Sequence, residues 1–294
     1  MAPGDGRAVK IRSFAKINLG IEVLGKREDC YHEIRTLFQA VEFSDILEFG
    51  PSAEREVRLS GTDASIPWDE RNLIHRAARL LQQDFPKAGG VEVLVTKNIP
   101  PGKGLGGGSS NAAMTLFALN GLWELGLDRS RLQEYGRRLG ADVPYFLEGG
   151  FCLGEGRGDV ITPLPDLPVL YCVLALPFFP ILTGDIYGRL RLTSPAEDSK
   201  MNRFLARREF GLLENRLEET VFSLYPRLKA IKSSFLHKEA VLSLVSGTGS
   251  AVFGLFEDRE KAARALTELG RTEEALLVET LSRERYWKRA TAGV

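Results

Sequence analysis

Residues 100–113 read Pro100-Pro101-Gly102-Lys103-Gly104-Leu105-Gly106-Gly107-Gly108-Ser109-Ser110-Asn111-Ala112-Ala113. Before this stretch, valine occupies every second position of residues 91–95, which predicts a β-strand. After it, apolar residues recur at helical spacing as far as Trp123, and Ser109 or Ser110 is available to cap the predicted helix. A strand, a run of glycines and a helix in this order predict a loop that binds phosphate groups.

The physical basis of this prediction is the backbone of the loop. Glycines let backbone N–H groups approach a ligand closely and converge on it. The free N–H groups at the start of the helix add partial positive charge, and Lys103 is expected to supply a full one. The alternative is a flexible surface loop that only closes a tight turn, and the run of glycines beside two hydroxyls favours the phosphate loop.

The loop differs from the common phosphate-binding motifs. It is not a Walker A motif because no Gly-Lys-Ser/Thr closes it. The His-Arg-Asp and Asp-Phe-Gly motifs of protein kinases are absent from the sequence. Gly102, Gly104 and Gly107 satisfy the dinucleotide-binding pattern, but that fold needs a strand ending in an acidic residue about 20 residues later, where this sequence predicts helices.

Composition excludes several classes of protein. The chain has 294 residues, so two domains are expected, and its 39 basic residues balance 39 acidic ones, which argues against nucleic-acid binding. Cys30, Cys152 and Cys172 lie far apart and predict neither a metal site nor a disulfide framework. Residues 1–10 lack the apolar run of a signal peptide, and residues 168–182 are too short and too rich in proline to span a membrane. We expect a cytoplasmic protein without nucleic-acid or membrane partners.

The N-terminal part of the chain predicts long strands. Apolar residues fall on the odd positions of 9–24 and polar ones mostly on the even positions, which indicates a half-buried strand. Lys16 and Asn18 then lie on one face, about 7 Å apart, opposite the core face. Residues 31–49 predict further strand, with Ser44-Asp45 as a turn.

The remaining pattern predicts an α+β protein of two domains. The proline-rich segment 162–168 is the expected domain boundary. Helices are predicted over 71–83, 131–139, 213–235 with a break at Pro226, and 258–269; strands over 169–176, 251–256 and 275–280; and a polar, poorly patterned stretch over 191–208.

The sequence resembles a known kinase superfamily. The loop at 100–113 is similar to the ATP loop of the GHMP kinases (galactokinase, homoserine kinase, mevalonate kinase and phosphomevalonate kinase), and Ser246-Gly247-Thr248-Gly249-Ser250 resembles their third glycine-rich motif. The segments 15–19 (Ala-Lys-Ile-Asn-Leu), 31–34 (Tyr-His-Glu-Ile) and 140–146 (Gly-Ala-Asp-Val-Pro-Tyr-Phe) resemble the branch that phosphorylates the 2-hydroxyl of a cytidine-diphosphate-linked methylerythritol in non-mevalonate isoprenoid synthesis. The resemblance spans nearly the whole chain and is densest up to about residue 160.

The resemblance implies a fold, a cofactor and partners. The fold is the two-domain GHMP kinase fold, with a ribosomal-protein-S5-like domain over 1–162 and a ferredoxin-like α/β domain over 163–294. ATP and Mg²⁺ are the implied cofactors, the partner is a small-molecule substrate, and a monomer or weak homodimer is expected. The alternatives are a homoserine or mevalonate-type kinase, or a nucleotide-binding protein without turnover.

The resemblance also assigns catalytic residues. Asp142 precedes Val143-Pro144, a rigid turn that suits a proton acceptor, although by itself it resembles an ordinary helix N-cap. The family makes Asp142 the catalytic base and Lys16 the second catalytic residue, stabilising charge on the moving phosphoryl group. Asn18 is expected to hold a substrate hydroxyl or a phosphate oxygen. Without the family, Lys16 and Asn18 would be a solvated strand face.

The remaining site residues are implied by the resemblance alone. Tyr31 and Tyr187 would stack on the cytosine and His32 would read it. The other positions are Asn72 and Lys97 near the adenine, Ser110 as a magnesium ligand, and Thr183, Gly247 and Thr248 for the substrate. Cys30 and Leu182 depart from the usual family residues.

Overall fold

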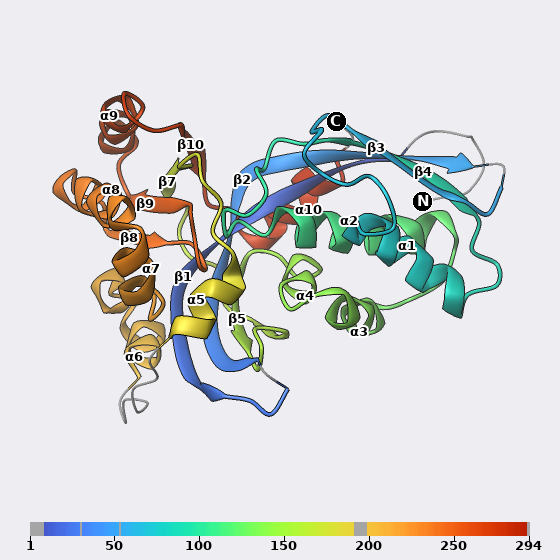
Figure 1. Ribbon diagram of the computed structural model, residues 1–294, viewed down its shortest axis with the longest axis horizontal. Coiled ribbons are helices and arrows are strands. Elements are labelled where there is room, and N and C mark those ends of the chain that lie inside the picture. Colours follow the sequence, from blue (N-terminus) through green and yellow to red (C-terminus); the bar gives the residue numbers. More distant parts are fainter. Residues whose placement is uncertain (1–8, 30, 53, 191–198, 293–294) are drawn as a thin grey trace.

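The computed structural model describes residues 9–29, 31–52, 54–190 and 199–292. Cys30 and residues 191–198 of the polar stretch lie outside them. Two β-sheets organise these residues, and Figure 1 shows them side by side, each with its own helices. Of the helices described, none is long and apolar enough to cross a membrane.

The first sheet has the strand order β3-β4-β2-β5-β6, with β1 paired to β2. Its strands are β1 (Val9–Lys26), β2 (His32–Ser52), β3 (Val57–Gly61), β4 (Gly90–Thr96), β5 (Phe151–Glu155) and β6 (Val160–Pro163). β1 and β2 form one long antiparallel hairpin, whereas β3 and β4 are parallel. β2 therefore connects both halves of the sheet, pairing with β4 over residues 46–52 and with β5 over residues 36–39.

The second sheet has the order β10-β7-β9-β8, and all its pairs are antiparallel. Its strands are β7 (Tyr171–Ala175), β8 (Leu242–Val245), β9 (Val252–Phe256) and β10 (Ala275–Glu279). Around it lie α5 (Thr183–Arg189), α6 (Lys200–Arg207), the 3₁₀ turn η1 (Phe210–Leu212), α7 (Glu218–Leu224), α8 (Pro226–His237) and α9 (Arg259–Leu269). Pro226 begins α8, where its missing N–H costs no hydrogen bond, so the predicted break is confirmed.

The helices of the first sheet are α1 (Leu73–Asp84), α2 (Gly107–Leu122), α3 (Arg129–Leu139), α4 (Val143–Phe146) and, from the far end of the chain, α10 (Arg283–Ala290). Figure 1 shows α10 among the green helices of this part. Tyr286 and Ala290 of α10 are fully buried in the same core as Phe14 of β1. The chain thus returns to its first half after completing the second sheet, and residue 163 stays our proposed boundary between the domains.

The strand predicted over 9–24 is confirmed as β1, but the prediction that it is half-buried is wrong. Residues 13–21 of β1 are all buried. From Ala15 onward the odd-numbered side chains pack in cores shared with the second sheet, while Lys16 and Asn18 on the other face lie against Gly106 and Gly247. The pairing with β2 shifts between Phe14 and Ala15, and the side chains change cores at that point. Ile11 and Phe14 enter the core under α1 and α2, whereas Ile17 enters a core shared with the second sheet.

Two smaller predictions are also wrong. Ser44-Asp45 is not a turn, because β2 runs straight through it and Asp45 is fully buried. The Asp45 carboxylate accepts hydrogen bonds from the backbone N–H groups of Asn98 and Ile99, each at 2.8 Å. The stretch 191–208 contains a helix, α6, whose Met201 and Phe204 are buried against the shared core.

Candidate active site

The glycine-rich loop has the conformation that its composition predicts. Gly102, Gly104 and Gly106 all have positive φ, between 69° and 74°, where other residues are strained. A Cβ atom on Gly104 would lie 2.0 Å from the carbonyl oxygen of Ser246, and one on Gly106 would lie 2.7 Å from the Phe146 ring. Glycine is therefore required at Gly104 and Gly106 because neighbouring protein atoms leave no room for a side chain, whether or not a ligand is bound.

The start of α2 is left open to a ligand. Gly106, not Ser109 or Ser110, is the N-cap residue, so the predicted serine cap is wrong. Because glycine has no side chain, no side-chain hydrogen bond caps the first turn at Gly106. The N–H groups of this turn remain available to an anion, as a phosphate loop requires.

Lys16 and Asp142 meet although 126 residues separate them in sequence. The Lys16 ammonium lies 3.4 Å from the Asp142 carboxylate, and its side chain is 4% exposed against 33% for Asp142. Asp142 is the N-cap residue of α4, but its side chain makes no capping hydrogen bond. The carboxylate is therefore not engaged in ordinary N-capping and faces the ammonium.

Asn18 holds Lys16 in place. Its Oδ1 accepts from the Lys16 ammonium at 2.5 Å, and its Nδ2 donates to Thr36 at 2.8 Å. The Thr36 hydroxyl in turn donates to the carbonyl of Gly20 at 2.9 Å. Lys16 and Asn18 share a face, as predicted, and the side chain of Asn18 is already committed to the protein.

A cavity of about 390 Å³ collects most of the predicted acceptor and catalytic residues. Its walls contain Lys16, Asn18, Tyr31, His32, Asp142, Thr183, Tyr187, Gly247 and Thr248, together with Gly104 of the loop. β1, β2, the loop, the segment before α4, α5 and the turn between β8 and β9 each contribute, so both halves of the molecule form it. The cavity is where the two substrates of a transfer reaction could meet.

One end of the cavity carries aromatic rings. The rings of His32 and Tyr187 lie 5.0 Å apart, centre to centre, with a tilt of 34°, and Tyr31 is 54% exposed nearby. Burial, and then the charge of Lys26, lower the pKa of His32 below its usual 6.5, so its ring is neutral at pH 7. Burial also raises the pKa of Tyr187, and the charge of Asp142 adds to this shift. A neutral imidazole that can donate and accept, beside aromatic rings in the same cavity, suits a planar base.

The C-terminal motif lines the cavity beside Asn18 of β1. The hydroxyls of Thr183 and Thr248 lie 3.2 Å apart. Asn215 donates to the carbonyl of Gly247 at 2.7 Å and so fixes the turn at its place beside Gly104. The motif thus reaches the same cavity as the loop, as the resemblance implies.

Three predicted ATP-side residues have other partners. The ammonium of Lys103 is buried and donates to the carbonyls of Pro177 and Phe179, so it does not carry its charge into the cavity as predicted. Lys97 pairs with Asp45 at 2.7 Å and donates to the carbonyl of Ile99. Asn72 caps α1, accepting from the backbone N–H of Ile74 at 3.0 Å.

The remaining loop residues are placed as follows. Ser110 is fully buried and accepts a hydrogen bond from Ser13 at 2.7 Å. Pro101 and Gly108 are exposed, whereas Pro100 and Ser109 are half-buried and Leu105 is buried in the shared core. The carbonyl of Leu105 accepts from the backbone N–H of Lys16 at 3.0 Å, which ties the loop directly to β1.

Comparison with known proteins places this arrangement in a family. Residues 72–150 match the GHMP kinase N-terminal domain and residues 201–275 the GHMP kinase C-terminal domain. The chain is 39% identical to 4-diphosphocytidyl-2-C-methyl-D-erythritol kinase of Solibacter usitatus, covering 97% of this chain and 93% of the relative. It is 41% identical to the same-named protein of Syntrophus aciditrophicus, covering 90% and 95%. The chain belongs to the 4-diphosphocytidyl-2-C-methyl-D-erythritol kinase family.

Solved structures agree with this membership. A crystal structure of 4-(cytidine 5'-diphospho)-2C-methyl-D-erythritol kinase superposes with a TM-score of 0.79 at 35% identity, covering 92% of this chain and 99% of that one. Homoserine kinase from Cytophaga hutchinsonii has a TM-score of 0.75 at 20% identity, which shows a shared fold. The predicted fold class, with GHMP kinase N- and C-terminal domains, is confirmed.

Several residues that line the cavity were not predicted from the sequence. Arg157 lines the aromatic end, with its guanidinium carbon 5.0 Å from the centre of the Tyr31 ring, and pairs with Asp159 at 2.7 Å. Gly156 and Gly158 flank it, both with positive φ. That Gly-Arg-Gly turn was a usable signal for a cation presented on a tight loop. Phe38 and Leu217 carried no such signal, because both look like core residues.

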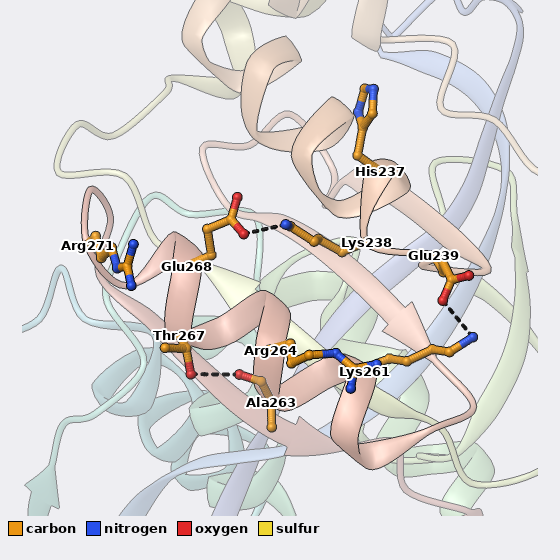
Figure 2. Close-up of a pocket in the computed structure, with 9 residues that line it drawn as sticks. All are labelled: His237, Lys238, Glu239, Lys261, Ala263, Arg264, Thr267, Glu268 and Arg271. Atoms are coloured by element: carbon orange, nitrogen blue, oxygen red, sulfur yellow. Dashed lines mark hydrogen bonds and ion pairs between the residues drawn. The ribbon is translucent and has the colours of Figure 1, made fainter.

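A larger cavity of about 550 Å³ lies elsewhere, between the end of α8 and α9. Figure 2 shows Lys238 paired with Glu268 and Lys261 paired with Glu239 across it. None of the predicted site residues lines this cavity. Two of the lysines that line this cavity are already paired with glutamates, and no glycine-rich loop reaches it. The larger cavity is therefore not our candidate for the active site.

Proposed function

We propose that this chain transfers the γ-phosphoryl group of ATP to the 2-hydroxyl of 4-diphosphocytidyl-2-C-methyl-D-erythritol, a step of non-mevalonate isoprenoid synthesis. Family membership supports the substrates. The observation that carries the chemistry is the 3.4 Å pair of Lys16 and Asp142 inside a cavity that touches the glycine-rich loop on one side and aromatic rings on another.

The proposed reaction gives each of the two groups one task. Asp142 accepts the proton of the attacking substrate hydroxyl, and the oxygen of that hydroxyl bonds to the γ-phosphorus. The bond between the γ-phosphorus and the β–γ bridging oxygen breaks at the same time, which releases ADP. Lys16 donates hydrogen bonds to the oxygens of the transferred group, where negative charge is concentrated. Because Lys16 is nearly fully buried, its interaction is screened less than that of a surface lysine.

The two ends of the cavity support the assignment of the two substrates. The uncapped first turn of α2 at Gly106 offers N–H groups to the ATP phosphates. Tyr31, His32 and Tyr187 offer stacking faces and a neutral imidazole to the cytosine. Homoserine and mevalonate have no ring that could use this aromatic end, so the site favours a cytidine compound.

We propose that Mg²⁺ accompanies ATP. No group of three or more histidine, cysteine or acidic side chains among the described residues could hold a metal. Mg²⁺ commonly binds through substrate phosphates and water with one or two protein oxygens. Ser110 lies in the first turn of α2, but its hydroxyl is fully buried and accepts from Ser13, so the proposed ion would be held mainly by the ATP phosphates. When bound, the ion would neutralise phosphate charge. A cytoplasmic location and a monomer or weak homodimer complete the proposal.

Product formation by the purified protein tests the proposed function. With ATP and Mg²⁺, the protein should release ADP and give a singly phosphorylated product with 4-diphosphocytidyl-2-C-methyl-D-erythritol, measured by mass spectrometry and phosphorus NMR. Homoserine and mevalonate, assayed in parallel, should give no product. Turnover of either one in preference to the cytidine compound would contradict the assignment, as would ATP binding without transfer to any of the three.

Asn18→Ala is expected to lower kcat about tenfold while changing both KM values less. The substitution removes the acceptor that holds the Lys16 ammonium, so the charge is misplaced although it remains present. Steady-state kinetics of Asn18→Ala and of Thr36→Val, which removes the partner of Asn18, test this. A raised KM for the acceptor with unchanged kcat would instead show that Asn18 binds substrate directly.

A further inference from the structure

Lys103 sits at a contact between the two halves of the molecule. Its side chain is 7% exposed, and its ammonium donates to the carbonyl of Pro177 and, at 2.9 Å, to that of Phe179. Both carbonyls belong to residues 176–182, which connect β7 to α5 and which we call the α5 connection. A lysine of the glycine-rich loop is therefore bonded to the backbone of the second half.

Neighbouring contacts fix the same part of the loop. The backbone N–H of Ile181 donates to the carbonyl of Gly102 at 3.3 Å, and that of Ala251 donates to the carbonyl of Lys103 at 3.1 Å. The Ser246 hydroxyl donates to the carbonyl of Gly104 at 2.8 Å. The loop itself is thus held by bonds from the β8–β9 turn, whereas the α5 connection depends on Gly102 and Lys103 for its contacts with the loop.

The α5 connection leads directly into the wall of the cavity. Thr183, Gly184 and Tyr187 of α5 line that cavity on the side of the second substrate. Phe178 is 79% exposed and Leu182 is 70% exposed, so they contribute little packing. The buried side chain of Ile181 and the Phe179 ring, stacked on Tyr225, pack the α5 connection onto the core around α7 and α8, and the Ser250 hydroxyl also donates to the carbonyl of Phe179.

We propose that Lys103 is a positioning residue that sets the distance between the ATP loop and the acceptor-binding wall formed by α5. This inference rests on the proposed function, which places ATP on one side of the contact and the cytidine substrate on the other. Phosphoryl transfer requires the two substrates to be aligned closely, and a misplacement of about 1 Å lowers the rate strongly. The ammonium acts through two backbone carbonyls and does not touch a phosphate.

Lys103→Met and Lys103→Gln separate this role from phosphate binding. Met keeps the length and apolar character of the side chain but has no donor, whereas Gln is neutral and keeps an NH₂ group for the carbonyls. Lys103→Met should lower kcat/KM for the acceptor about tenfold, the equivalent of one or two hydrogen bonds, and leave the KM for ATP within about twofold. Lys103→Gln should recover part of this loss. An equal rise in the KM for ATP in both variants would overturn the proposal, because it would show that the charge binds phosphate.

Hydrogen–deuterium exchange of the ligand-free protein tests the contact independently of any substrate. Peptides from residues 177–190 should exchange faster in Lys103→Met than in the wild type and at an intermediate rate in Lys103→Gln, while α9 serves as the unchanged control. Thermal unfolding of both variants, measured on the same preparations, shows that they are folded before their exchange is compared. Unchanged exchange in Lys103→Met would overturn the proposal. A failure of the proposed function would appear differently, as absent turnover in the wild type with the exchange differences intact.

Discussion

Asp142→Asn is expected to lower kcat by about 10²- to 10⁴-fold, the usual contribution of a positioned proton acceptor. The amide keeps the size of the side chain but cannot accept the proton of the attacking hydroxyl. The fold should remain intact, because the Asp142 side chain makes no capping bond to α4 and is one-third exposed. Steady-state kinetics, with thermal unfolding to confirm the fold, measure the effect.

The matched control for this variant is Asp185→Asn. Asp185 lies in the first turn of α5, is exposed, and does not line the cavity. Asp185→Asn removes the same charge from a nearby surface position and should leave kcat within about twofold, as is usual for substitutions of exposed residues outside a binding site. If Asp142→Asn turned over nearly as fast as Asp185→Asn, Asp142 would not be the proton acceptor.

Lys16→Met is expected to lower kcat by about 10²- to 10³-fold, because one preorganised donor to the charge of the transition state is lost. Met fills a similar volume among the buried side chains of β1. Removing the ammonium also leaves the Oδ1 of Asn18 without its 2.5 Å donor, so the free energy of unfolding should fall by about 1–3 kcal/mol. Kinetics and urea unfolding on the same preparation separate the two effects.

Lys10→Met is the control on the same strand. Lys10 pairs with Glu48 at 3.2 Å, and its side chain is 32% exposed, far from the cavity lining. Lys10→Met also removes a lysine from β1, but kcat should stay close to that of the wild type. The double variant Lys16→Met/Asp142→Asn should lose far less than the product of the two single losses if the pair acts as a unit. Fully multiplicative losses would show that the two residues act independently.

Local sequence was sufficient where local chemistry decides the structure. The glycine-rich loop was predicted because left-handed backbone at Gly102, Gly104 and Gly106 requires glycine. The break at Pro226 was predicted because proline lacks an N–H group. Lys16 and Asn18 share a face because strand side chains alternate. These features depend on few neighbours in space.

Predictions from the sequence were wrong where the partners of a residue come from distant segments of the chain. Asp45 looked like a turn residue, but the backbone of residues 98–99 supplies the donors that keep it inside a continuous strand. Lys103 looked like a phosphate ligand, but two carbonyls of the α5 connection take its ammonium. A polar side chain binds whatever partner the fold brings to it, and that partner is not written in the neighbouring residues.

The sequence by itself determined the strongly periodic helices and strands, the family, and the residue types from which a transfer site could be built, but not α6 or the unbroken course of β2. Tertiary structure decided which of them share one cavity. It brought the ammonium of β1 to the carboxylate before α4, buried residues 13–21 of β1 on both faces, and left three expected ATP-side residues bound to the protein. The physical reason is that alternation and spacing depend on the chain alone, whereas burial and pairing depend on the free energy of all segments packed together.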